Sequence, residues 1–219
     1  MLLLVGEDHY SECHINVHPN THTIFVEVPP ARFLKSMNDN SCIRQVLANQ
    51  NVNIINVDLR SMSAIDEKLP LMCVQMILEC ESTAACKELY SSSGLFSQCV
   101  NSTHLLLTNP DQWLNKSKLF KDINREVALE MLRVVQSRRF LAFLEVVMGK
   151  SGDMHGMLSV KQMETAYNHF ALGLNDLYTY MQYLKKNPSG YCTAYVGFEH
   201  ANHLYDVMKK FGEDVQKII

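Results

Sequence analysis

The stretch LLLVGEDH, residues 2–9, decides the fold expected of this chain. Its first four residues form a continuous apolar run, which is typical of a strand buried on both faces of a parallel sheet. Gly6 ends the run, and a glycine there lets the backbone turn sharply. The arrangement recurs near the other end of the chain, where CTAYV, residues 192–196, is followed by GFEH, residues 197–200. We therefore predict that two short G-x-x-H loops present His9 and His200 at one end of a sheet.

Two other apolar runs predict further strands. The run TIFVEV, residues 23–28, is rich in β-branched and aromatic side chains and stops at two prolines, and the run VNIINV occupies residues 52–57. Other segments have helical periodicity, with apolar side chains repeating three or four positions apart. We expect helices at residues 32–50, over much of residues 69–147, and at residues 159–186 and 201–211.

The order of these elements predicts an α/β fold. We expect a small, mainly parallel sheet flanked by helices, with a helical insertion between the third and last strands. The 219 residues suit a single domain. Within it, residues 1–65 and 158–219 are expected to form the α/β core, and residues 66–157 the helical insertion.

The composition argues against several classes of protein. The chain carries a net charge of −3 and has no dense cluster of basic residues, so we expect no binding of nucleic acid or of a membrane surface. No apolar run approaches the length of a membrane span. The seven cysteines are odd in number and none has C-x-x-C spacing, which favours free thiols in a reducing compartment. We therefore expect a cytoplasmic, intracellular protein.

Ionisable groups follow each of the four predicted strands: Glu7 with His9, then Glu27, then Asp58 with Arg60, and finally Glu199 with His200. In open α/β sheets, ligands bind beyond the carboxyl ends of the strands. A carboxylate such as Glu27, in a run that reads as buried, is costly unless it is paired. These positions therefore predict one polar site at the end of the sheet.

Several kinds of chemistry remain open for such a site. Imidazole and carboxylate groups together can hold a divalent metal that activates water, or a histidine can act as a general base that a carboxylate orients. Arg60 can stabilise an oxyanion or hold an anionic group of a substrate. Equally, Asp58 and Arg60 can form a simple ion pair, and each histidine can be a hydrogen-bonded structural residue.

The order of the motifs resembles that of the superfamily that groups the erythromycin-esterase-like hydrolases, the ChaN-like proteins and the Tiki and TraB proteins. The resemblance rests on LLLVGEDH at residues 2–9, FVEVP at residues 25–29, VDLR at residues 57–60 and AYVGFEHANHLYDVMKKFG at residues 194–212. The segment LNDLY, residues 174–178, also resembles the helix before the last strand in compact, virus-type members. The resemblance covers about the first 60 and the last 50 residues, and the middle of the chain matches no part of the superfamily's pattern.

The resemblance implies a hydrolase of ester or peptide bonds with a small-molecule or peptide substrate. Tiki-like members imply a divalent metal, manganese, cobalt or zinc, held by His9, Glu27 and His200. Esterase-like members imply that His9 acts as a base while Glu7 and Glu27 position water. With Arg60 holding the substrate, the predicted catalytic residues are Glu7, His9, Glu27, Arg60 and His200. The alternative is a non-catalytic protein that binds haem, as ChaN-like members do, or a metal or a partner protein in the same cleft. Virus-type members also imply the host cell of a virus as a location.

Overall fold

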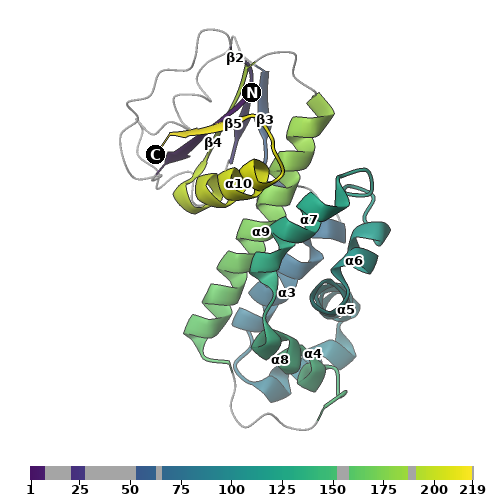
Figure 1. The fold of residues 1–219 in the computed structure, drawn as a ribbon. Helices are drawn as coiled ribbons and strands as arrows, with labels where there is room; N and C mark the ends of the chain where they lie inside the picture. Colours follow the sequence, from purple (N-terminus) through teal and green to yellow (C-terminus); the bar gives the residue numbers. More distant parts are fainter. Residues whose placement is uncertain (8–20, 28–52, 63–65, 152–157, 187–190, 219) are drawn as a thin grey trace. The chain divides into compact units, whose positions relative to one another are not determined.

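The computed structural model of the chain describes residues 1–7, 21–27, 53–62, 66–151, 158–186 and 191–218 (Figure 1). The chain divides into two compact units. The first unit comprises Met1–Met62 and Leu174–Ile219, and the second comprises Ser63–Gly173. The helix predicted at residues 32–50 lies outside the described residues.

The first unit contains an all-parallel sheet of five described strands, which confirms the α/β fold. The strands are β1 (Leu2–Glu7), β2 (Thr21–Val26), β3 (Asn53–Asn56), β4 (Tyr191–Gly197) and β5 (Val215–Ile218). Their order across the sheet is β3-β2-β4-β1-β5, and every described pairing is parallel. The helical insertion lies in the chain between β3 and β4, as predicted.

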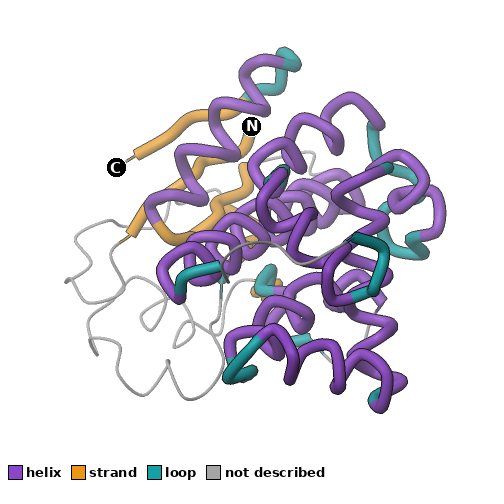
Figure 2. Tube along the Cα trace, turned by 90° about the horizontal axis from the view of Figure 1, so that it is seen from below, coloured by secondary structure: helices purple, strands orange, loops and turns teal. Residues whose placement is uncertain are grey.

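Strand β5 was not predicted from the sequence. It pairs with β1 at the edge of the sheet, and the two strands lie side by side near the ends marked N and C in Figure 2. Its sequence, VQKI, contains two polar residues, and only Val215 is buried. An edge strand pairs on one side only and tolerates polar side chains. It therefore lacks the continuous apolar run by which the other strands were recognised.

The register of the sheet brings the starts of the two G-x-x-H segments together. Strand β4 lies between β2 and β1, and Gly6 pairs with Val196 while Glu7 pairs with Gly197. Both segments therefore begin at the same edge of the sheet, from adjacent strands.

The second G-x-x-H segment is not a loop, and this part of the prediction is wrong. Helix α10 (Phe198–Lys210) begins directly after β4, so His200 lies in its first turn. Gly197 makes the strand-to-helix turn by itself, and no side chain caps the helix. The sequence therefore lacked the Ser, Thr, Asp or Asn that usually marks a helix start. Helix α10 packs on β1, β4 and β5.

Gly6 sets how closely α10 approaches β1. A Cβ atom added at Gly6 would lie 3.1 Å from Cβ of Ala201, which is fully buried, and 3.3 Å from Cα of Phe198. Because both neighbours belong to one helix, we expect Gly6→Ala to lower the free energy of unfolding by about 1–3 kcal/mol. Urea denaturation followed by circular dichroism measures the change.

The matched control is Gly94→Ala, at the exposed first residue of a helix in the second unit, where an added Cβ meets nothing within 4 Å. There we expect no loss, and a small gain because alanine restricts the unfolded chain. An equal response of the two variants would contradict the close approach at Gly6.

The second unit is helical in all of its described elements. These are a 3-10 turn (Asp66–Lys68), α3 (Leu69–Leu78), α4 (Thr83–Ser92), α5 (Gly94–Thr108), α6 (Pro110–Lys116), α7 (Arg125–Met131), a 3-10 turn (Leu132–Val135), α8 (Arg138–Val147) and the first half of α9 (Val160–Lys186). The side chains of Ser82, Ser93, Asn109, Asn124 and Ser137 accept backbone N–H groups where α4, α5, α6, α7 and α8 begin. These caps divide the expected long helical section into several short helices. The sequence pattern did not show the breaks, because apolar periodicity continues across them.

The described cysteines and helices agree with what the composition predicts. The five described cysteines are all free, and four of them, Cys73, Cys86, Cys99 and Cys192, are buried, as expected. Among the described helices, none is both long and apolar enough to cross a membrane.

Candidate active site

The site is built around Glu27, the residue that follows β2. Its side chain is 4% exposed and receives donors from three other parts of the first unit. The backbone N–H of Gly197 donates to Oε2 at 3.1 Å, while Arg60 Nη2 and Asn175 Nδ2 donate to Oε1 at 3.0 and 3.4 Å. His200 Nε2 lies 3.3 Å from the same Oε1. The carboxylate therefore has donors on both oxygens.

Asp58 and Arg60 form a pair that positions the guanidinium. Asp58 is fully buried and accepts the backbone N–H of Arg60 at 2.8 Å, Nε at 2.9 Å and Nη2 at 2.9 Å. Burial raises the pKa of Asp58, and the hydrogen bonds and charge of Arg60 oppose this rise. Since the same Nη2 also reaches Glu27, Arg60 bridges two carboxylates at the ends of β2 and β3.

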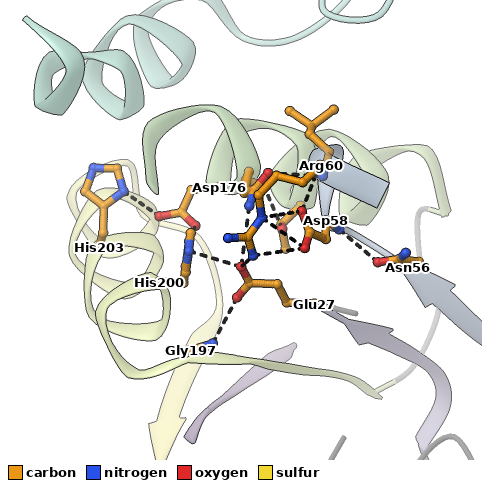
Figure 3. A network of polar contacts seen from close by, with 11 residues as sticks. Glu27, Asn56, Asp58, Arg60, Asp176, Gly197, His200 and His203 are labelled. Atoms are coloured by element: carbon orange, nitrogen blue, oxygen red, sulfur yellow. Dashed lines mark hydrogen bonds and ion pairs between the residues drawn. The ribbon is translucent and has the colours of Figure 1, made fainter. Parts of the chain in front are cut away.

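Asp176, in the second half of α9, is shared by two histidines of α10 (Figure 3). Its Oδ1 lies 2.6 Å from His200 Nδ1, and its Oδ2 lies 2.6 Å from His203 Nδ1. A carboxylate only accepts, so each Nδ1 carries the proton. Asp176 thereby fixes the ring orientation of both histidines.

His200 is held at both ring nitrogens, by Asp176 at Nδ1 and by Glu27 at Nε2. Burial alone lowers the pKa of His200, but the charges of Glu27 and Asp176 and the hydrogen bond from Asp176 outweigh burial and the repulsion of Arg60. The net result raises its pKa from 6.5 to about 9. At neutral pH the imidazole is therefore a cation with a proton on each nitrogen.

The acids of the cluster lie beneath its basic groups. The carboxylates of Glu27, Asp58 and Asp176 are at most 4% exposed, whereas the side chains of Arg60, His200 and His203 are 14–22% exposed. Solvent, or a ligand, therefore meets the basic groups first. Such an arrangement can donate protons and hydrogen bonds to a bound molecule.

Three of the five predicted catalytic residues lie together in this cluster: Glu27, Arg60 and His200. Glu7 ends β1, and its backbone pairs with Gly197, whose N–H donates to Glu27. His9 lies outside the described residues. Glu199, also noted at a strand end, is exposed in the first turn of α10.

Sequence reasoning missed Asn175, Asp176 and His203 as members of the site. The signal for the first two was an adjacent Asn-Asp pair inside an otherwise apolar helical segment, where both residues are now at most 2% exposed. His203 follows His200 by three positions, the spacing that places two side chains on one helix face. Asn175 accepts the backbone N–H of Leu59 and donates to Glu27, so it joins the ends of β2 and β3 to α9.

Glu27 and His200, the two described residues among the metal ligands that the resemblance implies, do not fit that role as they are arranged here. The Nε2–Oε1 distance of 3.3 Å between His200 and Glu27 is near the separation of two ligands of one ion with bonds of about 2.0–2.1 Å. However, Oε1 of Glu27 also binds the Arg60 guanidinium, whose charge would repel a metal ion at that oxygen. Among the described residues, no group of three or more His, Cys, Asp or Glu side chains is arranged to hold a metal.

Comparison with known proteins does not assign this site to a family. No family model, curated protein or solved structure matches the chain. A role for the cluster therefore rests on its own geometry and on the order of its motifs.

Proposed function

We propose that the chain is a hydrolase of ester or peptide bonds, of the erythromycin-esterase-like, ChaN-like and Tiki-TraB type, and that this cluster is its active site. One observation carries the proposal: His200 lies between the buried carboxylates of Glu27 and Asp176, at 3.3 and 2.6 Å, yet its side chain remains 14% exposed. A leaving group needs a proton donor with a fixed orientation. His200 is such a donor, and it lies at the end of a parallel sheet, where α/β proteins bind their ligands.

His200 is the proposed general acid. When water adds to the carbonyl carbon of the substrate, the carbonyl oxygen becomes negative and the bond to the leaving group then breaks. His200 donates its proton to the leaving oxygen or nitrogen, and the proton lost by water passes to a base. The sequence places Glu7 and His9 at the end of β1. His9 is the proposed base that takes this proton, and Glu7 is proposed to position the water. The products are a carboxylic acid and an alcohol or amine.

Arg60 and Glu27 have supporting roles in this proposal. Arg60 is held by Asp58 and supplies a fixed positive charge for the developing oxyanion, a role that needs no reorganisation during the reaction. The carboxylate of Glu27 is itself held in place, because its oxygens accept hydrogen bonds from Arg60 and Gly197. In this position it keeps His200 protonated and oriented. No step requires a bound metal.

We expect His200→Gln to lower the hydrolytic rate about 100-fold or more, because glutamine keeps the size and polarity of the side chain but cannot donate a proton as a general acid. A panel of chromogenic esters of different acyl length and fluorogenic peptides, assayed both with and without EDTA, first identifies a substrate. The ratio kcat/KM of the variant on that substrate then measures the effect.

The matched control is His169→Gln, at an exposed histidine of α9 within the second unit, which is expected to leave kcat/KM unchanged. Full activity of His200→Gln would refute the assignment of the acid. Activity that disappears with EDTA and returns with a divalent metal would show that the metal-dependent alternative is correct.

One observation favours a second function, the non-catalytic binding of haem. His203 Nδ1 is anchored on Asp176, while its Nε2 has no partner among the described residues. A histidine that ligates a metal is usually held in this way by a carboxylate on its other nitrogen. A Soret band after incubation with haemin, lost in His203→Gln, together with no hydrolysis across the panel, would support binding over catalysis.

A further inference from the structure

The second unit contains a cavity of about 280 Å³ that takes no part in the proposed hydrolysis. It lies among the 3-10 turn at Asp66–Lys68, helices α5 and α6, which pack on each other, and Ser117 just after α6. Its lining combines the buried Glu67, Trp113 and Ser117 with the partly exposed Ser102 and Leu105, and with the exposed Asp66, Asn101 and Lys116. The cavity thus has a buried floor and a polar rim.

Glu67 is the unusual member of this lining. It is 5% exposed, and its Oε1 accepts the hydroxyl of Ser117 at 2.5 Å and the backbone N–H of Leu119 at 3.0 Å. Its Oε2 has no partner among the residues that the structure describes. A buried carboxylate oxygen without a donor is costly, so it normally meets water or a ligand. The cavity that Glu67 lines is far larger than the roughly 30 Å³ that one water molecule takes up in the liquid.

The rest of the lining indicates what kind of molecule suits the space. Trp113 and Leu105 supply apolar surface, and the indole N–H is already used, since it donates to Ser102 at 3.1 Å. The ligand must therefore bring its own donor for Glu67 and an apolar part for Trp113. The two carboxylates, Glu67 and Asp66, outnumber the one rim cation, Lys116. We infer that this cavity binds a small primary amine with an apolar or aromatic group, its ammonium on Glu67.

The chain offers a built-in reporter, because Trp113 is its one tryptophan. Phenethylamine is the probe, and 2-phenylethanol is the neutral comparison of nearly the same size. With excitation at 295 nm, we expect phenethylamine to change the Trp113 emission saturably. Its Kd should be at least about tenfold lower than that of the alcohol, since charge-assisted hydrogen bonds are the stronger ones.

Glu67→Gln keeps an acceptor for Ser117 and Leu119 but removes the charge, so it should abolish the preference for the amine. Glu88→Gln is the matched control, at an exposed glutamate of α4 outside the cavity, and should keep the preference. Circular dichroism checks that the variants fold. Asn101→Phe narrows the exposed rim without touching the bonds of Glu67, and should weaken phenethylamine binding at least about tenfold.

Three results would overturn the inference. The first is the absence of saturable binding of phenethylamine. The second is equal affinity for the amine and the alcohol. The third is unchanged binding of the amine to Asn101→Phe, or to a folded Glu67→Gln. None of these results bears on the hydrolase, whose residues lie in the first unit.

Discussion

Arg60→Met is expected to lower the free energy of unfolding by about 3–5 kcal/mol at pH 7, the largest effect among the substitutions considered. Methionine keeps much of the aliphatic length of the side chain but removes the guanidinium. Asp58, which is fully buried, and Glu27, which is nearly so, would then lose their shared cation. A buried carboxylate without a cation costs far more than the intact pair contributes. Urea denaturation followed by far-ultraviolet circular dichroism measures the loss.

The control for this prediction is Arg125→Met in the second unit. Arg125 pairs with Asp111 through Nε at 2.7 Å, but both side chains are substantially exposed. Exposed ion pairs contribute at most about 1 kcal/mol, so this variant should differ little from the parent protein. Equal losses in the two variants would contradict the claim that burial makes the Arg60 cluster costly to break.

Protonation of His200 should make the folded protein more stable at pH 6 than at pH 9. Its pKa is raised in the folded state to about 9, from 6.5 in the unfolded chain. Between these values the folded state binds more protons than the unfolded state, so stability falls as the pH rises. The contribution of His200 is complete below pH 6.5 and is lost as the pH passes through about 9. It amounts to at most about 3 kcal/mol, at 1.36 kcal/mol for each unit of pKa.

His200→Gln separates this contribution from that of other groups. The groups that face His200 are Glu27, Asp176 and Arg60, and each keeps its charge in the variant. We expect urea denaturation at pH 6, 7.5 and 9 to show a much flatter pH profile for the variant than for the parent protein. Nuclear magnetic resonance titration of the His200 ring gives the pKa directly. A value at or below 6.5 would show that burial outweighs the two carboxylates.

Part of the site could be predicted from short segments because those segments are strand ends. Apolar runs identified β1, β2, β3 and β4, and all four carry ionisable residues where they end. The carboxyl ends of parallel strands share one edge of a sheet, so Glu27, Arg60 and His200 could be expected together. Asp176 could not be placed in this way, because it lies inside α9 and no strand end marks it.

The chemical role of each residue depended on contacts between distant parts of the chain. The N–H of Gly197 that donates to Glu27 is 170 positions away from it, and the amide of Asn175 is 148 positions away. From the sequence, Glu27 was a candidate metal ligand or water-positioning group. In the folded unit, these donors instead occupy lone pairs of its carboxylate. The protonation of His200 likewise follows from two buried carboxylates that meet it only in the folded unit.

Local sequence was thus enough for the α/β class, the helical segment between β3 and β4, and the edge of the sheet where polar groups gather. Those features follow from hydrophobic periodicity and from glycines that end strands, which act over a few residues. The pairing of Glu7 with Gly197, the sharing of Asp176 by two histidines and the charge of His200 depended on the tertiary fold. Hydrogen bonds and pKa values are set by groups within a few ångströms in space, whatever their distance along the chain.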